Sequence, residues 1–408
     1  MLKKTTDILI LGAGIGGYEA FRSLAKQFKK HGINKKITII DRHNYFTFTP
    51  MLHEVASGSV QAAHCAIPIR EIIHDTPHEF WQTTVEKIDP SKKSVRTSHG
   101  TISYQYCIVG LGSKTNYFQT PGAQKLTHHV RDLPGAIALH QEVIHQLEDK
   151  NLSNIDLVVV GGGATGVELA GQFCHLAEKE VRQLYPENKM TITIVQSSDY
   201  LMKYSHPEVR NQVKNRLTKS GVRILLNSKV KKVGKDHIQL ENGKKIKSTI
   251  TAWTAGFANI APDFIAEKYC KDGQIKVNQH LQSPKSQYLY ALGDIAHCQY
   301  KKDHIYPKLG EVAHKQGQYL GKEIASRILK TKNPSFQYQL SGELVPIGDW
   351  YAVAHIGPLN FHGRFAWWLR RTVYLHFIPG FMRKLRIVID WTLHSFGFRH
   401  IIDLDHDK

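Results

Sequence analysis

The sequence predicts an α/β protein with two parallel-sheet units, each built around a glycine-rich loop, and a helical carboxyl-terminal region. The pattern Gly-x-Gly-x-x-Gly occurs at residues 12–17 and again at residues 161–166, each time directly after an apolar run. After residue 361 the composition shifts toward aromatic and basic residues. Because a chain of 408 residues exceeds one ordinary core, we expect two or three domains.

The first glycine loop lies in a complete strand, loop, helix and strand unit. The expected elements are a strand over residues 7–11, a helix over 18–31 and a strand over 37–40. Gly12 permits the tight turn, Gly14 lets the backbone approach a pyrophosphate, and Gly17 lets helix and strand pack closely. Asp41 ends the second strand, where a carboxylate accepts hydrogen bonds from a ribose. The unit therefore predicts a Rossmann-like dinucleotide site.

The second glycine loop repeats this unit about 150 residues later. The expected elements are a strand over residues 155–160, a helix over 167–185 and a strand over 191–195. Gly161, Gly163 and Gly166 occupy the three glycine positions of the loop. Two such units in one chain predict two dinucleotides, or one dinucleotide and a degenerate copy.

The second unit ends in Gln196 where the first ends in an acid. An acid at this place repels the 2′-phosphate of NADPH, so its replacement removes a discriminating charge. One hypothesis is that NADPH is tolerated, with Lys203 as a partner for the phosphate. The alternative is that neutral Gln196 still bonds the ribose hydroxyl and NADH stays preferred. The sequence leaves both open.

A third nucleotide signal follows the two units. An apolar run over residues 288–292 closes on Gly293 and Asp294. Alone, this pair is an ordinary turn. Behind two nucleotide loops, it predicts that backbone N–H groups and the Asp294 carboxylate meet the ribityl and phosphate part of a flavin.

These motifs and several shorter stretches resemble one known family. The resembling residues are 12–17, 48–52 with 55–58, 67–70, 111–113 with Asn116 and 121–122, 166–171, 253–256 and 293–294. They are similar to the two-dinucleotide-binding flavoproteins of the pyridine nucleotide-disulfide oxidoreductase superfamily, and within it to type II NADH dehydrogenases, which are single-chain, non-proton-pumping NADH:quinone oxidoreductases.

The resemblance implies FAD at the first loop and NADH, or NADPH, at the second. It implies an FAD domain in two segments, residues 1–125 and 285–325, around an inserted NAD(P)H domain over residues 126–284, with membrane-anchoring helices in residues 326–408. Further cofactor contacts are implied at Arg42, Pro50, Gly112, Gly256 and Ala313. The implied reaction passes hydride from the nicotinamide to the flavin and then two electrons to a membrane quinone.

Glu168 is the first candidate catalytic residue. By resemblance it lies near the place where the nicotinamide meets the isoalloxazine. The residue alone has a simpler explanation. A carboxylate two residues beyond Gly166 lies in the first turns of the expected helix, where it caps the helix and is favoured by the helix dipole. Both interpretations stay open.

The acceptor side departs from the family pattern. Relatives carry Ala-Gln-x-Ala-x-Gln after the Gly-Asp strand, whereas this chain has Glu311 and Lys315 at the two glutamine positions. Glu311 and Lys315 are four residues apart and share one face of the expected helix. One explanation is that they form a surface ion pair. The other is that a charged pair replaces two amides at the entrance of the electron-acceptor site. No Cys-x-x-Cys occurs among the five cysteines, which argues against a dithiol centre and disulfides.

The carboxyl-terminal segment predicts two amphipathic helices separated by Pro379 and Gly380. The first contains Trp367, Trp368, Arg370 and Arg371. In the second, Arg383, Arg386, Asp390 and His394 form one stripe, largely opposite Phe381, Leu385, Val388, Ile389, Thr392 and Phe396. Apolar faces with basic and tryptophan flanks are typical of helices in a membrane interface, although packing on the protein itself or on a sister subunit gives the same pattern.

The formal charge of +19 fits a polyanionic partner, either anionic lipid or nucleic acid. We expect the anionic membrane surface, at the cytoplasmic face of the cell membrane, with no nucleic acid and no metal; a homodimer stays open. No run of eighteen apolar residues occurs. Two rival functions remain: an NAD(P)H reductase for a soluble acceptor, and a redox flavoprotein resembling apoptosis-inducing factors that contacts nucleic acid.

Overall fold

The computed structural model describes residues 2–151, 153–301, 304–339, 342–378, 380–397, 399 and 401; the side chains of residues 2–3 and 394–396 are outside it. Pro379, residues 402–408 and the side chains of His394 and Phe396, all part of the expected carboxyl-terminal region, therefore lie outside the described residues. The chain forms two compact units. Unit 1 comprises residues 1–49, 66–114 and 257–339, and unit 2 comprises residues 50–65, 115–256 and 340–408.

Unit 1 is built on one large sheet with the order β5-β2-β1-β8-β7-β6, and β21 pairs with β8. Its strands are β1 (Leu2–Leu11), β2 (Ile37–Asp41), β5 (Glu79–Gln82), β6 (Val85–Asp89), β7 (Ser94–Thr97), β8 (Gly100–Val109) and β21 (Leu289–Ala291). β1 pairs in parallel with both β2 and β8. The end of β1, from Ile8 to Leu11, is fully buried, as expected for a central parallel strand.

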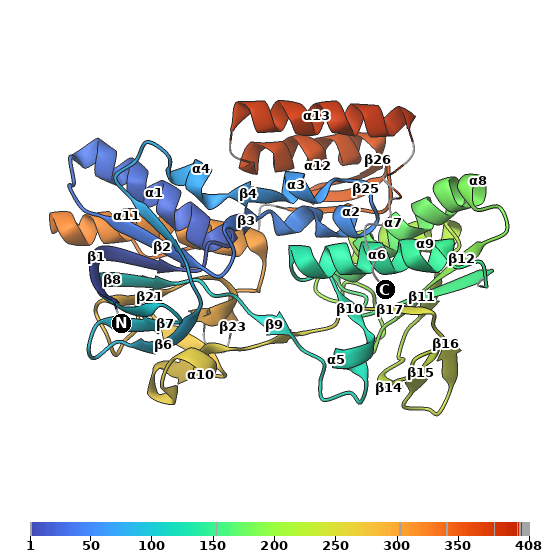
Figure 1. Ribbon diagram of the computed structural model, residues 1–408, viewed down its shortest axis with the longest axis horizontal. Coiled ribbons are helices and arrows are strands. Elements are labelled where there is room, and N and C mark those ends of the chain that lie inside the picture. The colour runs from blue at the N-terminus through green and yellow to red at the C-terminus, as the bar shows by residue number, and fades with distance from the viewer. Residues whose placement is uncertain are drawn as a thin grey trace. The chain divides into compact units, whose positions relative to one another are not determined.

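Two helices that are far apart in the sequence of unit 1 pack on this sheet. α1 (Ile15–His31) and α11 (Gly310–Leu329) lie side by side over one face (Figure 1). The remaining elements are β3 (Tyr45–Thr47), β4 (Ala66–Pro68), α4 (Ile69–Ile73), β18 (Phe257–Ala258), α10 (Ala261–Phe264), β19 (Cys270–Lys271), β20 (Gln274–Val277), β22 (Ala296–Lys301) and β23 (His304–Ile305). The sequence thus returns to this unit after the second glycine loop.

Unit 2 contains the second parallel sheet, with the order β10-β17-β11-β12-β13. Its strands are β10 (His128–His129), β11 (Asn154–Val160), β12 (Lys189–Val195), β13 (Arg223–Leu225) and β17 (Ile250–Trp253). A small sheet of β14 (Val230–Val233), β15 (His237–Leu240) and β16 (Lys245–Lys247) packs on it through Val230, Ile238 and Trp253. The helices are α5 (Ala123–Leu126), α6 (Leu133–Glu148), α7 (Ala164–Leu176), α8 (Arg182–Leu184) and α9 (Pro207–Lys219).

The helix expected over residues 167–185 is divided in the structure. α7 starts three residues earlier, at Ala164, and a π-helical turn over Ala177–Val181 separates it from α8. Glu180 is fully buried in this turn, so the irregular winding turns a carboxylate into the interior.

The carboxyl-terminal part of unit 2 consists of an antiparallel sheet and two helices. The elements are β24 (Glu343–Pro346), β25 (Ala352–Ile356), β26 (Leu359–Gly363), α12 (Arg364–Phe377) and α13 (Phe381–Phe396). α12 and α13 run side by side next to α2 (Leu52–Ala56) and α3 (Ala62–Cys65) (Figure 1). Within the described residues, no helix is both long and apolar enough to cross a bilayer. β9 (Lys114–Thr115) lies where the chain passes from unit 1 to unit 2.

Candidate functional site

The first glycine loop has the geometry of a nucleotide cradle. Gly12 has φ +93°, and a Cβ there would lie 2.5 Å from the Gly110 carbonyl oxygen. A Cβ on Gly17 would lie 1.9 Å from the Gly12 carbonyl oxygen, so both positions require glycine. Gly14 differs, because a Cβ there would meet nothing within 4 Å. The open space above Gly14 lies at the N-terminus of α1, where a pyrophosphate fits.

Asp41 is tied to this loop by hydrogen bonds. Its Oδ2 accepts from the Ala13 N–H at 2.8 Å, and its Oδ1 accepts from the His43 N–H at 2.8 Å. The carboxylate is therefore held at the end of β2 beside the loop, where a ribose would lie. Arg42 follows it as an exposed residue, and its carbonyl oxygen accepts from the Gln82 side chain at 3.2 Å.

Three later segments of unit 1 meet at the same place. Ser113 donates its hydroxyl to the Asp294 carboxylate at 2.7 Å, which joins the end of β8 to the Gly-Asp turn. A Cβ on Gly16 would lie 3.1 Å from the Ala313 carbonyl oxygen, so α11 touches the first loop. The structure therefore brings the loop, Asp294 and Ala313 together, with Gly112 in the turn after β8 at φ +72°.

The second loop repeats the cradle in unit 2. Gly161 has φ +109°, and a Cβ on Gly166 would lie 1.9 Å from the Gly161 carbonyl oxygen. A Cβ on Gly163 would meet nothing within 4 Å. Gln196 Oε1 accepts from the Gly162 N–H at 2.8 Å, which is the contact that Asp41 makes in the first loop. In the described residues, no side chain caps the N-terminus of α1 or α7, which leaves their N–H groups available to a phosphate.

Gly256 and Lys203 also lie in unit 2. Gly256 follows β17 with φ +72°, and a Cβ there would lie 2.4 Å from the Phe118 ring. Lys203 is exposed in the turn after β12.

Glu168 lies on α7 at the edge of a buried group of charged side chains. Its carboxylate Oε2 is 3.4 Å from His53 Nδ1, and its side chain is 14% exposed, compared with 3% for His53. Burial raises the pKa of Glu168 to about 8, against an opposing effect of Arg370. The N-cap position of α7 is occupied by Gly163, and Glu168 lies inside the helix, four residues after its first residue.

Arg370 organises the interior of this group. It is 1% exposed and donates from Nη1 to Glu54 Oε1 at 2.7 Å and from Nη2 to the Pro50 carbonyl oxygen at 3.2 Å. Its Nη2 also lies 3.3 Å from His53 Nε2. Burial alone would raise the pKa of Glu54, but the charges of Arg370 and Arg371 together, with a smaller effect of His53, hold that pKa below its ordinary value. Pro50 thus contributes a carbonyl oxygen to an arginine here.

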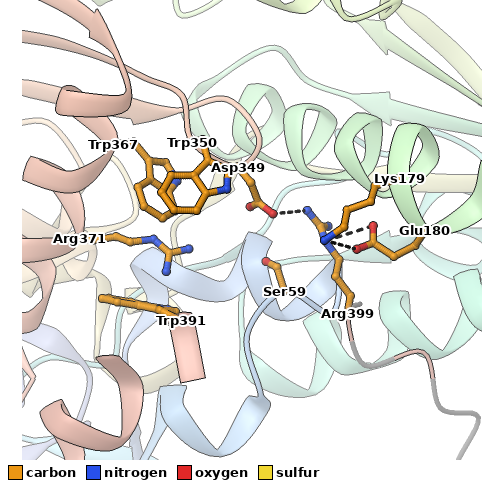
Figure 2. A pocket seen from close by; sticks show the side chains of 9 residues that line it. All are labelled: Ser59, Lys179, Glu180, Asp349, Trp350, Trp367, Arg371, Trp391 and Arg399. Carbon is orange, nitrogen blue, oxygen red and sulfur yellow. Dashed lines mark hydrogen bonds and ion pairs between the residues drawn. The ribbon is translucent and has the colours of Figure 1, made fainter. Parts of the chain in front are cut away.

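Arg371 lies in an aromatic cage beside a small cavity. Its guanidinium is 4.0 Å from the centre of the Trp367 ring and 4.3 Å from that of Trp391. Figure 2 shows these rings on either side of it, next to the pair formed by Asp349 and Arg399 at 3.1 Å. The cavity has room for about 20 Å³, which suits a water molecule.

The expected basic flank of the first carboxyl-terminal helix is therefore wrong for two of its residues. Arg370 and Arg371 are buried at 1% and 5% exposure, and Trp367 at 3%. Glu54 pairs with both arginines, since its Oε1 lies 2.7 Å from Arg370 Nη1 and its Oε2 lies 3.5 Å from Arg371 Nη2, and Asp349 also acts on Arg371. A helix pattern shows which residues share a face, but only a partner carboxylate makes that face an interior one.

Glu311 and Lys315 occupy different environments on α11. Glu311 is half-buried, and its charge, together with burial, raises the pKa of Tyr338. Lys315 is exposed. The residue that α11 sends to the Gly-Asp turn is Gln316, whose Oε1 accepts from the Gly293 N–H at 2.7 Å.

Sequence reasoning missed four residues of these sites: His53, Glu54, Arg370 as a buried ion-pair partner, and Gln316. His53 and Glu54 lie between two stretches that resemble the family, residues 48–52 and 55–58, and neither was singled out. A usable signal was the carboxylate of Glu54 within an otherwise largely apolar run, because a charged residue in such a run needs a buried partner.

The family description "Pyridine nucleotide-disulphide oxidoreductase" matches residues 6–317, which contain both cradles. The chain belongs to this family. It is 25% identical over 407 residues to "Probable NADH dehydrogenase" of Dictyostelium discoideum, covering 94% of this chain and 88% of that protein. It is 24% identical over 415 residues to "Type II NADH:quinone oxidoreductase Ndh" of Mycobacterium tuberculosis, covering 95% and 87%.

The fold is also found in a solved structure. The structure of NDH2 from Plasmodium falciparum in complex with NADH superposes with a TM-score of 0.89 at 22% identity, covering 97% of this chain and 99% of that one. The resemblance to type II NADH dehydrogenases that the motifs indicate is confirmed by these relatives, and so is the α/β fold with two dinucleotide-binding units.

Proposed function

We propose that this chain is an FAD-dependent NAD(P)H:quinone oxidoreductase of the type II NADH dehydrogenase kind. The observation that carries the proposal is the pair of matching cradles, one in each unit, within a family of pyridine nucleotide oxidoreductases. FAD is assigned to the loop of Gly12, Gly14 and Gly17, and NADH, with NADPH also accepted, to the loop of Gly161, Gly163 and Gly166.

The protein's part in this reaction is to bind and orient two cofactors, because the flavin supplies the hydride and electron chemistry. Asp41, Gly112, Asp294 and Ala313 surround the first loop and are assigned to FAD, together with Arg42. Gln196 and Gly256 are assigned to the nicotinamide nucleotide. Pro50 is also proposed as a cofactor contact. The contact that its carbonyl oxygen makes within the protein is with Arg370. Glu168, Glu311 and Lys315 are the proposed catalytic residues.

A membrane quinone is the proposed acceptor. The relative from Mycobacterium tuberculosis is named an NADH:quinone oxidoreductase, which supports a quinone over a thiol. All five cysteines of this chain are free, and Cys65, Cys107, Cys174 and Cys298 are buried. Burial raises the pKa of the Cys174 thiol to about 11, so it is protonated at neutral pH and a poor redox nucleophile.

The proposed membrane contact is the outer face of α13. Its exposed apolar side chains are Phe381, Met382, Leu385, Val388, Ile389 and Leu393. Arg383, Arg386 and Asp390 line a cavity of about 350 Å³ on the flank of this face, and Asp390 pairs with His64. An apolar face with arginines on its flank fits the interface of an anionic bilayer, which supports a peripheral position at the cytoplasmic face of the membrane.

The function is tested by two half-reactions in a stopped-flow instrument. We expect NADH to bleach the flavin absorbance anaerobically, and menadione or ubiquinone in liposomes to restore it within turnover time. If NADH reduces the flavin but only a small redox protein, and no quinone, reoxidises it, the acceptor is a soluble protein and the quinone assignment is wrong. DNA binding at physiological salt with negligible turnover would instead support the nucleic-acid rival.

The membrane contact is tested by charge on the apolar face. Leu385→Glu and Leu393→Glu should reduce cosedimentation with vesicles of anionic lipid at least tenfold, because each replaces an exposed apolar side chain that would enter the bilayer interface with a charge. The matched control is Leu184→Glu on α8, which is 45% exposed and should leave cosedimentation unchanged. Loss of a dimer peak in sedimentation velocity, with vesicle binding intact, would assign this face to a second copy of the chain.

A further inference from the structure

The buried group around Glu168 is assembled from three distant parts of the chain. His53 and Glu54 come from α2, Glu168 from α7 and Arg370 from α12. Only Glu168 has an exposed edge; the side chains of the other three are 3% exposed or less. A ligand next to α7 can therefore exchange a proton with Glu168, while His53, Glu54 and Arg370 affect its protonation from the buried side.

The contacts of Arg370 decide where His53 carries its proton. A guanidinium has only donors, so an imidazole nitrogen that faces it must be the acceptor. Nε2 of His53 lies 3.3 Å from Arg370 Nη2, within hydrogen-bond distance, whereas the Glu54 Oε1 that could accept from a protonated Nε2 is farther away, at 3.7 Å. Nε2 is therefore assigned as the acceptor and carries no hydrogen. Burial, with Arg370 next, lowers the pKa of His53 to about 3, so the ring is neutral at physiological pH. A neutral ring with a bare Nε2 has its proton on Nδ1.

The Nδ1–H of His53 then faces Glu168. The distance from Nδ1 to Glu168 Oε2 is 3.4 Å, a loose contact of the kind that shortens when a site closes on its ligands. A donor at this position favours the carboxylate form of Glu168, while burial favours the protonated form. The other charged or titratable groups acting on Glu168 are Glu54 from α2 and Arg370 and Tyr374 from α12.

We propose that His53, held in a single neutral tautomer by Arg370, is a positioning residue that presents its Nδ1–H to Glu168 and so sets how tightly Glu168 holds a proton. The proposal rests on the proposed function in one respect, because the proton is the one that must accompany hydride and electron transfer to a quinone. In this step the O–H bond of Glu168 breaks and a quinone oxygen takes the proton as the quinone accepts the electrons that NADH supplies. Glu168 then regains a proton from water at its exposed edge.

Two substitutions of His53 separate this role from a structural one. The amide nitrogen of Asn occupies the place of Nδ1, so His53→Asn keeps a donor toward Glu168 and loses the acceptor for Arg370. The longer Gln places its amide near Nε2, so His53→Gln keeps a partner for Arg370 and loses the donor toward Glu168.

The first measurement is a pH titration of the Glu168 carboxyl group by infrared difference spectroscopy on the oxidised holoenzyme, with Glu168→Gln to identify its band. We expect His53→Gln to raise the midpoint by about one pH unit, since one N–H donor to the carboxylate is lost. His53→Asn should stay within about 0.3 unit of the native midpoint. Equal shifts in both variants, or none in either, would overturn the proposal.

The second measurement reads the tautomer directly and needs no variant of His53 to be active. In 15N-histidine-labelled holoenzyme, the His53 signals, identified by their loss in His53→Asn, should show a protonated Nδ1 and a bare Nε2. The opposite tautomer would overturn the proposal even if His53→Gln does not fold. A holoenzyme that passes both tests but transfers no electrons to quinone would contradict the proposed function and leave the positioning role in place.

Discussion

The two glycine loops share a backbone but differ in the carboxylate that follows each. Glu19 and Glu168 stand at the same place, two residues beyond the last glycine of the loop. Glu19 has its own helix partner, since Arg22 Nη2 lies 2.9 Å from its carboxylate. On α7 the position that corresponds to Arg22 is Gly171.

Packing explains why α7 carries no arginine there. A Cβ on Gly171 would lie 2.7 Å from the backbone nitrogen of Gly348, so the loop after β24 leaves no room for a side chain. Each glutamate also faces a histidine Nδ1, His314 at 3.6 Å from Glu19 and His53 at 3.4 Å from Glu168. The comparison teaches that the same loop geometry occurs twice, while the neighbouring packing gives the two glutamates different partners.

The largest expected effect comes from blocking the open space of each cradle. Gly14→Val and Gly163→Val add side chains where no protein atom lies within 4 Å, so both should fold and both should obstruct a pyrophosphate. Gly14→Val should retain less than a tenth of the native flavin. Gly163→Val should keep its flavin but reduce it with NADH at least a hundredfold more slowly. Flavin absorbance and stopped-flow rates measure this, with circular dichroism as the folding control.

An exchange of these outcomes between the two variants would reverse the assignment of FAD and NADH to the loops. Full flavin and native reduction rates in both would mean that neither space receives a pyrophosphate.

The next effect separates the two glutamates. Glu168→Gln removes a carboxyl group with a pKa of about 8 and should lower kcat by roughly 10²-fold, which is typical for a lost acid-base group. Glu19→Gln should leave kcat near native and lower Tm by a few degrees, because Arg22 and His314 lose a charged partner. Steady-state kinetics and thermal melts of both variants check the contrast. Native kcat and KM in Glu168→Gln would leave a structural role only.

A smaller effect is expected at the strand ends, Asp41 and Gln196. Both accept from a loop N–H at 2.8 Å, so Gln196→Glu keeps this contact and adds a charge beside the ribose. The added charge should lower kcat/KM for NADPH about tenfold relative to NADH. If the native enzyme already prefers NADH a thousandfold, NADPH tolerance is wrong and Lys203 has no phosphate to bind.

The smallest expected effect is the pH dependence of stability. Glu168 has a pKa raised from 4.5 to about 8 in the folded protein, so the folded state binds its proton more tightly than the unfolded state. The contribution of this proton to the free energy of unfolding is present below pH 4.5 and is lost as the pH rises toward 8. The loss is no more than about 1.4 kcal/mol per pH unit. The Tm advantage of Glu168→Gln over native enzyme should therefore grow by about 2–4 °C between about pH 5 and 8. A constant difference would contradict it.

The nucleotide cradles could be predicted from the sequence because their physics is local. The turn at Gly12 and the contact of Gly17 with the Gly12 carbonyl arise within six residues, and so do those of Gly161 and Gly166. Asp41 and Gln196 follow at the end of the next strand, where parallel pairing brings them back to the loop. The order of motifs therefore determined the α/β fold and its two sites.

The surroundings of Glu168 were decided by tertiary structure alone. Helix periodicity assigned Arg370 and Arg371 to a membrane-facing flank, whereas a buried carboxylate 316 positions earlier, Glu54, draws both into the interior. Local sequence reports which residues share a helix face, but the pairing of buried charges depends on which distant segments meet. For that reason the chain alone predicted where two nucleotides bind, and only the folded molecule showed that Glu168, unlike Glu19, lies beside the buried group of His53, Glu54 and Arg370.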